Sequence, residues 1–449
     1  MSELALFGGP KAITYKGTGK HDGSDVFAWP IITQEDENAI LEVLRRGGMS
    51  GIDVTQKFEK EFAEWVGSKY ALGLHNGTAA LHAAMFGCGI GHGDEVICQS
   101  STYWASCTSA LALGATLVFA DIDQDTLCLD PKKLEAKITS KTKAIIVVHY
   151  LGHPAEMDEI MDIAKKHNLK VIEDVSHAQG GLYKGRRLGT IGDVGAASLM
   201  TAKSFAIGEA GILYTDDIEI YERAIAFGTY ERFENMQTEY LRPIEGLPLG
   251  GYKHRMHQLS SAMGLVQLKY YDQRCAEIRK AMNYFGDLLE GVPGLKAFRV
   301  DETTGSNMAG WYAARGIFKS EELGGLSVTR FCEALEAEGV ATIPGFNKPL
   351  HTHPLYQVAD IYNQGKPTRV ANSDYDVREM DKDLEVCMKM ATSVYKVPWF
   401  KKYDKEVIEQ YAEAFKKVVR NYKELLADDP GDPESLGGWN LSNAANKKS

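Results

Sequence analysis

The chain has 449 residues, of which 44% are hydrophobic and 25% are charged. These proportions are those of an ordinary globular protein, and they exclude a largely disordered chain, a collagen and a small disulfide-stapled fold. Because 61 acidic residues outnumber 50 basic ones, giving a net charge of −11, we do not expect nucleic acid to bind through the overall electrostatic field.

The sequence predicts a cytoplasmic protein with no membrane span and no metal site. Apolar runs such as Ala144–Val148 fall far short of the roughly 20 residues that a spanning helix needs. The first residues combine neither a basic leader nor a long apolar stretch, so no secretory signal is expected. Seven scattered cysteines without a CxxC pair favour reduced, buried thiols.

Two helices are predicted first, Thr33–Arg46 and Val54–Val66. From about residue 69 to residue 217, short apolar runs alternate with amphipathic segments, the pattern of strands separated by helices. The predicted strands are Tyr70–His75, Glu95–Cys98, Thr116–Ala120, Ala144–Val148, Lys170–Glu173, Ala196–Leu199 and Ile212–Tyr214. The predicted helices between them are Thr78–Phe86, Leu134–Ile138 and Glu156–His167. This alternation predicts an α/β fold with a mostly parallel, seven-stranded sheet covered on both faces.

Beyond this block, Gln258–Asn283 is predicted as a long helix, and a smaller α+β unit follows that ends in a helix over Lys405–Leu426. The predicted parts are an N-terminal extension (1–32), a large domain (33–285), a small C-terminal domain (286–427) and a polar tail (428–449). The tail lacks the apolar residues to order itself, and we expect it to fray or to dock on a neighbouring subunit.

The first candidate site feature is HNGTAAL, residues 75–81, at the junction of a predicted strand and helix. Gly77 allows a tight turn. Thr78 adds a hydroxyl at the helix N-terminus, where unpaired N–H groups and the helix dipole favour a phosphate. For this motif alone, an ordinary N-cap is the simpler explanation, because such caps are common.

The second feature is VIEDVSHAQG, residues 171–180, in which a buried strand runs directly into Glu173 and Asp174. Open α/β sheets place their ligands at the carboxyl ends of such strands. Asp174 is suited to pair with a protonated ring nitrogen, whereas Glu173 points to the opposite side and is expected to be structural. A helix cap or a loop ion pair is the alternative for Asp174.

The third feature is Lys203, which follows a predicted strand within the small and apolar stretch GDVGAASLMTAKSFAIGEAG. Loss of water around this amine would favour its neutral form, a nucleophile toward carbonyls, although a lone lysine is usually a surface charge. Ser198 and Thr201 add hydroxyl groups beside it. In the fourth feature, STYWAS at residues 101–106, Tyr103 or Trp104 would stack on a flat ring or simply fill the core.

Together the four features supply a phosphate seat, a stacking ring, a carboxylate for a pyridinium nitrogen and a nucleophilic lysine. These are the groups expected around pyridoxal phosphate, which acts as an electron sink while the protein orients it. The sequence therefore predicts a pyridoxal-phosphate enzyme.

With these motifs the chain resembles the DegT/StrS family of sugar aminotransferases, which have the aspartate-aminotransferase-like fold type I. The resemblance extends from about residue 32 to residue 419. It is carried by five blocks: GMSGIDVTQKFEKEFAEWVG (48–67), NGTAALHAA (76–84), GDEVI (93–97), DPKKLEAKITSKTKAIIVVHYLGHPAEMDEI (130–160) and HNLKVIEDVSHAQGGLYKGRRLGTIGDVGAASL (167–199).

The resemblance implies that Lys203 is the catalytic Schiff-base lysine and that Asp174 pairs with the pyridine nitrogen. Relatives that are deoxysugar dehydratases carry His in place of this lysine, so the resemblance favours transamination. It also implies four further contacts, to the cofactor phosphate and ring, from Gly77, Thr78, Ser198 and Tyr103.

Two positions depart from the family pattern. Where the family commonly has Gln against the cofactor ring, this chain has His177, with Gln179 two residues further on. We expect His177 to pack against the same face or to bond the phenolic oxygen. In the family motif GYNYRM, the Asn reaches the neighbouring subunit's cofactor phosphate. Here residues 251–256 read GYKHRM, and Lys253 either reaches that phosphate or is a surface residue.

The implied activity is transfer of an amino group from glutamate or glutamine to a keto-sugar or keto-cyclitol, by a ping-pong mechanism through an internal aldimine in a homodimer. LALFGGPKAI at residues 4–13 and KPLHTHPLY at residues 348–356 resemble cyclitol and aminoshikimate-type members more than typical nucleotide-sugar members. Alternatives are a nucleotide-sugar aminotransferase, a dehydratase or epimerase of the same fold, and a cofactor-binding regulator. Candidates for the mouth of the site are Trp311, Tyr312, His351 and His353.

Overall fold

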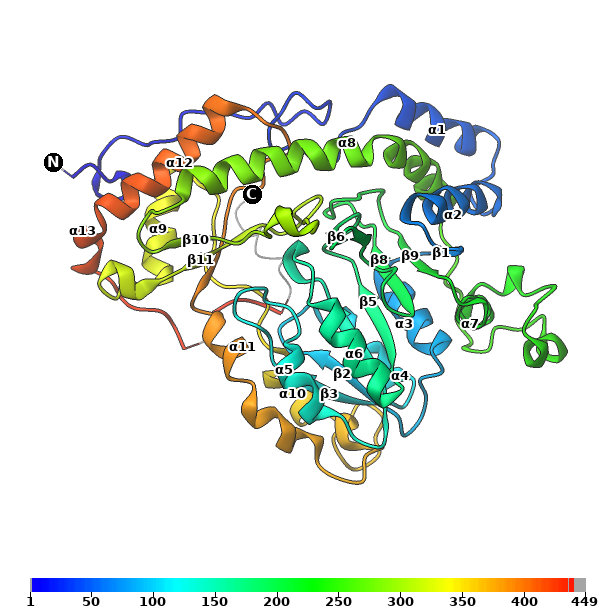
Figure 1. Ribbon diagram of the computed structural model, residues 1–449. Helices are drawn as coiled ribbons and strands as arrows, with labels where there is room; N and C mark the ends of the chain where they lie inside the picture. The colour runs from blue at the N-terminus through cyan, green and yellow to red at the C-terminus, as the bar shows by residue number, and fades with distance from the viewer. Residues whose placement is uncertain (1, 435, 440–449) are drawn as a thin grey trace.

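The computed structural model describes residues 2–434 and 436–439. Its main sheet has seven strands (Figure 1), in the spatial order β1 (Tyr70–Leu74), β9 (Gly211–Thr215), β8 (Val194–Ser198), β5 (Lys170–Asp174), β4 (Thr142–Val148), β2 (Glu95–Gln99) and β3 (Thr116–Ala120). The strands from β8 to β3 pair in parallel, and β9 runs antiparallel to β8 and β1. The predicted α/β fold with a mostly parallel, seven-stranded sheet is confirmed.

Helices cover this sheet because its strands are apolar on both faces, and every residue of β2, β3 and β9 is buried. The predicted helix Leu134–Ile138 is wrong in its bounds. Asp130 caps and Pro131 begins the short helix α5 (Pro131–Leu134), which then tightens into one 3₁₀ turn, Glu135–Lys137. The other covering helices are α3 (Gly77–Gly87), α4 (Ser109–Ala112), α6 (Met157–His167) and α7 (Ile218–Gly228).

The helices α1 (Gln34–Arg45) and α2 (Asp53–Val66) precede the sheet as predicted and pack on α8 (Gln258–Leu289). Figure 1 shows α8 running across the molecule from the main sheet to a second, smaller sheet. α8 continues beyond its predicted end at Asn283. Gly286 interrupts the apolar pattern there, but it lies where the helix approaches Arg299 and Ala297 closely.

The second sheet consists of β10 (Leu295–Ala297), β11 (Arg315–Phe318) and β12 (Val394–Lys396), all antiparallel. Near it lie α9 (Val328–Glu338), α12 (Lys405–Arg420) and α13 (Tyr422–Leu426). A single helix was predicted over the last two. The break falls at Asn421, whose side-chain amide donates to the Lys417 carbonyl, since asparagine competes with the helix for backbone partners.

Both ends of the described chain pack against its body. The N–H groups of Ala5 and Ala12 donate to the Glu338 carboxylate, which also pairs with Lys417. At the other end, residues 436–439 lie beside residues 346–348, and the Gly438 N–H donates to the Phe346 carbonyl. This part of the tail therefore docks on its own chain rather than fraying, while residues 435 and 440–449 lie outside the described residues.

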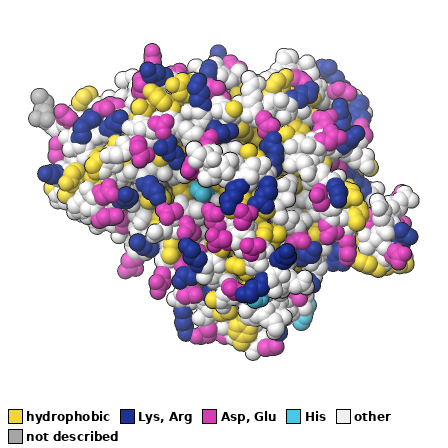
Figure 2. All heavy atoms as spheres, viewed as in Figure 1, with side chains coloured by type: hydrophobic (Ala, Val, Ile, Leu, Met, Phe, Trp, Pro, Cys, Tyr) yellow, Lys and Arg dark blue, Asp and Glu magenta, His cyan; other side chains and the backbone are white. Residues whose placement is uncertain are grey.

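On the face in Figure 2, basic and acidic side chains are interspersed rather than gathered by sign. All seven cysteines are buried free thiols. Within residues 2–434 and 436–439, no helix combines the length and the apolar character that crossing a bilayer requires.

A buried histidine on α3 makes the stability of the fold depend on pH. The ring of His82 lies edge-on to Phe227, with centroids 4.7 Å apart, and burial lowers the pKa of His82 from 6.5 to about 4. Between these two pH values the unfolded chain takes up a proton that folded His82 does not. The free energy of unfolding therefore falls as the pH falls from 6.5 toward 4.

In a His82→Phe variant, we expect this dependence to weaken by about 1.4 kcal/mol per pH unit, since one fewer proton is taken up on unfolding. Urea unfolding between about pH 5 and pH 7 measures the slope. His254, whose pKa burial also lowers to about 4, keeps part of the dependence. A slope equal to that of the wild type would contradict the assignment to His82.

Candidate active site

A cavity of about 240 Å³ lies at the carboxyl ends of the parallel strands. Its walls come from the segments that follow β1, β2, β5 and β8, joined by two side chains from beyond α8. It brings together eight of the predicted residues, Gly77, Thr78, Tyr103, Asp174, His177, Ser198, Lys203 and Tyr312. The lining also includes residues to which the sequence assigned no role, among them Asn76, Ser106, Ser176, Glu209 and Asn347.

The N-terminus of α3 forms one end of this cavity. The Asn76 side chain caps the helix by accepting from the Ala79 N–H at 2.8 Å, which leaves the preceding N–H groups without a partner in the helix. Gly77 is required here because a Cβ would lie 2.5 Å from the Cβ of Ser198. This close approach places the hydroxyl-bearing Thr78 and Ser198 in one cavity at a helix start, an arrangement that suits a phosphate.

Replacing Gly77 with alanine is expected to push α3 away from β8. We predict a loss of about 1–3 kcal/mol in the free energy of unfolding, as for other overpacked sites, and at least about tenfold weaker binding of pyridoxal phosphate. Absorbance titration and urea unfolding measure the two effects. Gly91→Ala is the matched control, because a Cβ at Gly91 meets no atom within 4 Å. Equal behaviour of the two variants would contradict the prediction.

Asp174 is held rigidly at the end of β5. Its carboxylate accepts from the Ser106 hydroxyl at 2.7 Å and from the Ser176 N–H at 3.0 Å, and the residue is 3% exposed. Ser106 is in turn bonded to Thr102. Ser106 is the last residue of STYWAS, but its role was not predicted, because a single serine carries no signal of what it will contact.

The neighbouring Glu173 lies on the other side of the strand and binds the protein itself. It accepts from His149 at 2.9 Å and from the N–H groups of Gly189, Ile191 and Gly192. Burial alone would raise the pKa of Glu173, but these hydrogen bonds hold it below its ordinary value. Glu173 thus fixes the loop at residues 189–192, in keeping with the structural role expected for it.

Lys203 is 8% exposed, and its amine faces the cavity. The Nζ atom lies 4.0 Å from the centroid of the Tyr312 ring, while the backbone carbonyl accepts from the Trp29 indole N–H at 3.0 Å. Tyr312 stands in an unusual stretch, because Trp311 and Ala313 on either side both have positive φ. Such strain is concentrated at functional sites, and it marks Tyr312 as part of this one.

His177 and Gln179 occupy different places. His177 lines the cavity and is 5% exposed. Its Nδ1 accepts from the Leu151 N–H at 3.2 Å, so the ring hydrogen is on Nε2. Burial, and then the charges of Lys203 and Arg315, hold the pKa of His177 well below its ordinary value. Gln179 lies in the wall behind, where it donates to the Ser198 carbonyl and accepts from Ser204.

Several candidates from the sequence lie away from the cavity lining. Lys253 is exposed, with its amine 5.8 Å from the Tyr230 ring centroid. His351 bonds Ser100, and His353 caps a short helix at residues 354–357. Trp104, Thr201 and Trp311 are likewise absent from the lining. Lys253 of the same chain therefore does not line this cavity, and the contact predicted for it is not made within the described residues of one chain.

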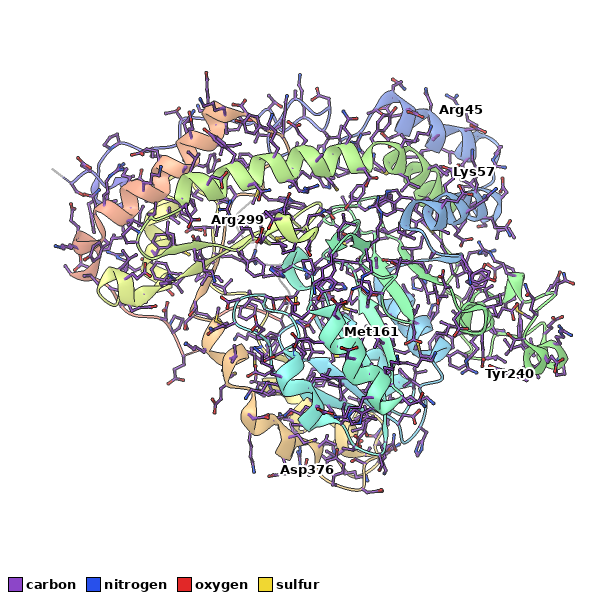
Figure 3. The ribbon with its side chains drawn as sticks, viewed as in Figure 1. Arg45, Lys57, Met161, Tyr240, Arg299 and Asp376 are labelled. Atoms are coloured by element: carbon purple, nitrogen blue, oxygen red, sulfur yellow. The ribbon has the colours of Figure 1, made fainter. Side chains whose placement is uncertain are left out.

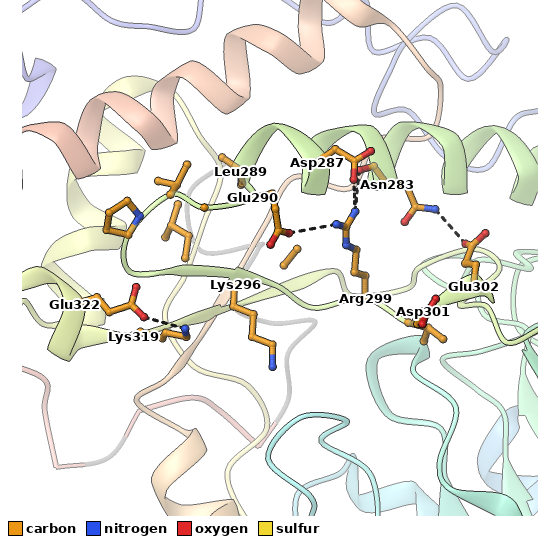
Figure 4. A pocket seen from close by; sticks show the side chains of 16 residues that line it. Asn283, Asp287, Leu289, Glu290, Lys296, Arg299, Asp301, Glu302, Lys319 and Glu322 are labelled. Carbon is orange, nitrogen blue, oxygen red and sulfur yellow. Dashed lines mark hydrogen bonds and ion pairs between the residues drawn. The ribbon is translucent and has the colours of Figure 1, made fainter. Parts of the chain in front are cut away.

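A larger cavity, of about 1090 Å³, lies between the end of α8 and β10. Figure 4 shows ion pairs among its side chains: Arg299 pairs with Asp287 and Glu290, and Lys319 pairs with Glu322. Since these charges already neutralise one another, the smaller cavity with Lys203 is the better candidate for chemistry.

Comparisons with known proteins point to aminotransferases. Residues 30–414 match the model of the DegT/DnrJ/EryC1/StrS aminotransferase family. The chain is 30% identical over 441 residues to the L-glutamine:scyllo-inosose aminotransferase of Streptomyces griseus, covering 94% of this chain and 99% of the relative. It is 34% identical over 333 residues to the GDP-perosamine synthase of Caulobacter vibrioides, covering 73% and 86%. The structure of an aminotransferase from Psychrobacter cryohalolentis matches with a TM-score of 0.75 at 29% identity, covering 88% and 99%.

Proposed function

Because the chain belongs to the DegT/DnrJ/EryC1/StrS aminotransferase family, we propose that it is a pyridoxal-phosphate enzyme that moves an amino group from glutamate or glutamine to a keto-cyclitol or keto-sugar. The observation that carries this proposal is the buried Lys203 amine in one cavity with the Asp174 carboxylate and the N-terminus of α3. A nucleophile, a carboxylate and a phosphate seat are the set that this cofactor needs.

The residues of the cavity fit the cofactor. Thr78 and Ser198 would hold the phosphate. They lie close together because residue 77 is a glycine, with no Cβ to fill the space between them. Asp174 would keep the ring nitrogen protonated, while Tyr103 and His177 would lie against the ring. When bound, pyridoxal phosphate supplies an electron sink for the negative charge that develops on the substrate carbon.

Lys203 would move the protons of the reaction. Its amine takes the proton from the α-carbon of the amino donor in the first half-reaction, as a general base. In the second half-reaction it gives a proton to the former carbonyl carbon of the ketone, which becomes the amine-bearing carbon. The Trp29 indole holds the Lys203 backbone in place, and the Tyr312 ring lies against the amine. The side chain can therefore move while its backbone stays fixed. Two half-reactions in one cavity predict ping-pong kinetics.

A keto-cyclitol is the ketone we favour, because the match to the Streptomyces griseus inosose aminotransferase extends over 94% of this chain. A nucleotide-linked keto-sugar is the alternative, supported by the match to a GDP-perosamine synthase. A panel of inososes and nucleotide-linked 3- and 4-keto sugars, each offered to the amino-loaded enzyme, distinguishes them. Return of the cofactor's starting absorbance only with inososes supports the cyclitol, and return only with nucleotide sugars rejects it.

A dehydratase or epimerase of the same fold is the enzymatic alternative, and a non-catalytic regulator is the other. Addition of glutamate or glutamine to the protein loaded with pyridoxal phosphate, which is yellow, distinguishes transamination from these alternatives. Transamination converts the cofactor to its amine form and bleaches the colour, whereas a dehydratase, an epimerase or a regulator leaves the colour unchanged. The lysine at position 203 supports transamination, since its amine can both take the α-proton of the donor and return a proton to the ketone carbon.

We further propose a homodimer, held in part by the segment at residues 229–252 that follows α7. Figure 3 shows this segment projecting from the body, with Tyr240 near its outer end. The segment exposes Tyr230, Tyr240, Ile244, Leu247, Leu249 and Tyr252, and exposed apolar side chains of this kind favour association. Lys253 follows it and would reach the partner's cavity. Light scattering that reports a monomer would reject the homodimer.

The buried free thiols support a cytoplasmic location.

A further inference from the structure

A buried side-chain amide in the cavity lacks part of its hydrogen bonding. Asn347 is 1% exposed and lines the cavity. The Tyr150 hydroxyl accepts from the Asn347 backbone N–H at 3.2 Å, so its own hydrogen is free to donate to Asn347 Oδ1 at 2.7 Å. With Oδ1 turned toward Tyr150, the hydroxyl hydrogen has an acceptor, and Nδ2 is the end of the amide that is left over.

The nitrogen end of that amide is left without a partner. Asn347 Nδ2 is buried, and it bonds no acceptor among residues 2–434 and 436–439. Leaving a buried donor unpaired is costly, and native structures rarely do so without a reason. Because the residue lines a cavity, a bound molecule with an acceptor oxygen is the partner that would complete its hydrogen bonding.

The charge of a buried arginine near this amide indicates which kind of oxygen Asn347 Nδ2 would bind. Arg315 is 5% exposed and donates to the carbonyls of Ala313, Ala314 and Gly345. Among the ion pairs of the described residues it has no carboxylate partner. Burial lowers the pKa of Arg315, but a guanidinium stays charged in proteins. Arg315 is not among the residues that line the cavity, but it bonds the Gly345 carbonyl two residues before Asn347, and its charge acts on His177 in the lining. An uncompensated buried cation in this wall favours an anion in the cavity.

We propose that Asn347 Nδ2 donates a hydrogen bond to the α-carboxylate of the amino donor, in the electrostatic field of Arg315. The inference rests on the proposed function, since an aminotransferase must hold an amino acid beside Lys203. Glutamate and glutamine share this carboxylate, so both donors depend on Asn347. A ketone substrate, which is uncharged at the reacting ring, does not need it.

The C-terminal segment 436–439 acts as a positioning element for this amide. Asn347 pairs with Gly438 in a parallel bridge, and the Lys348 N–H donates to the Gly438 carbonyl at 3.2 Å. Gly437 lies so close that a Cβ would be 2.0 Å from the Phe346 carbonyl oxygen. The segment thus holds the backbone on both sides of Asn347.

Asn347→Asp is the sharpest test, because Asp keeps the acceptor for Tyr150 and replaces the donor by a negative oxygen. Calorimetry with 2-methylglutamate, which has no α-hydrogen and cannot react further, measures donor binding directly. We expect its Kd to rise by more than about 100-fold in Asn347→Asp and by about 10- to 100-fold in Asn347→Ala. The affinity for pyridoxal phosphate and the KM for the ketone stay near the wild-type values.

Unchanged donor binding in Asn347→Asp, with an altered KM for the ketone, would overturn the proposal and assign Asn347 to the ketone. Failure of the wild type to react with glutamate and glutamine would instead count against the proposed function. For the positioning segment, Gly437→Ala is expected to raise the donor KM several-fold without changing cofactor affinity. Gly431→Ala is its control, since it has a similar positive φ and no atom within 4 Å of its Cβ. Equal donor KM values in these two variants would overturn the role of the segment.

Discussion

A Lys203→Ala variant is expected to lose transamination, with kcat reduced by about 10⁴-fold or more. The side chain supplies both the nucleophile for the cofactor carbonyl and the base that takes the α-proton, and no second lysine lines the cavity among the described residues. The measurement is a single-turnover reaction with glutamate or glutamine, followed by absorbance of the cofactor. Loss in this assay isolates chemistry from product release.

Lys319→Ala is the control for this variant, because Lys319 is a surface lysine paired with Glu322 in the larger cavity. We expect wild-type activity from it. Added methylamine, a small amine that can enter the space left by the side chain, is expected to restore part of the activity of Lys203→Ala. Turnover by Lys203→Ala close to the wild-type rate would contradict the role given to this residue.

An Asp174→Asn variant is expected to lose about 10²- to 10³-fold in kcat, since removal of a neighbouring carboxylate shifts a pKa by about 1–3 units. The amide keeps the shape of the side chain and can still accept from the Ser176 N–H, but it no longer holds a proton on the cofactor nitrogen. Steady-state kinetics and the cofactor absorbance as a function of pH measure the loss.

Glu173→Gln is the matched variant, one residue earlier on the same strand. Because Glu173 accepts from His149 and three backbone N–H groups, we expect it to lose about 2 kcal/mol in the free energy of unfolding and to keep its kcat. The two variants should therefore differ: Asp174→Asn lowers kcat, whereas Glu173→Gln lowers the free energy of unfolding. The same loss of kcat in both variants would contradict the distinction.

The sheet could be predicted from the sequence because buried parallel strands are short apolar runs, as in Ala144–Val148. The ends of the helices were harder to predict from the sequence. Gly286 looks like an interruption of α8 until its packing against Arg299 is seen. Asn421 gives no sign in the sequence that its side chain will bond the Lys417 carbonyl and end α12. The domain boundaries stay a prediction.

The cavity shows the same division between local and long-range information. Asp174 ends a strand, and Thr78 and Lys203 each follow one, so the position of a strand end was enough to find them. Asn347 and Ser106 reach the cavity through contacts with Tyr150 and Asp174 that lie far away in the sequence. No local pattern encodes such contacts, and the roles of all these residues in binding the cofactor remain predictions.

Burial alone does not identify the reactive lysine. Lys401 is also buried, at 7% exposure, and burial holds its pKa well below the ordinary value. Its amine lies against Trp399, outside the lining of the cavity. Only the common cavity with Asp174 and the N-terminus of α3 distinguishes Lys203.

Borohydride reduction of the protein with pyridoxal phosphate, followed by peptide mapping, tests the assignment of Lys203 most directly. Reduction makes the bond between the cofactor and its lysine permanent, so the labelled peptide reports which amine holds it. We predict one labelled site, Lys203. A label on Lys401 or Lys253, or no label at all, would contradict the proposed active site.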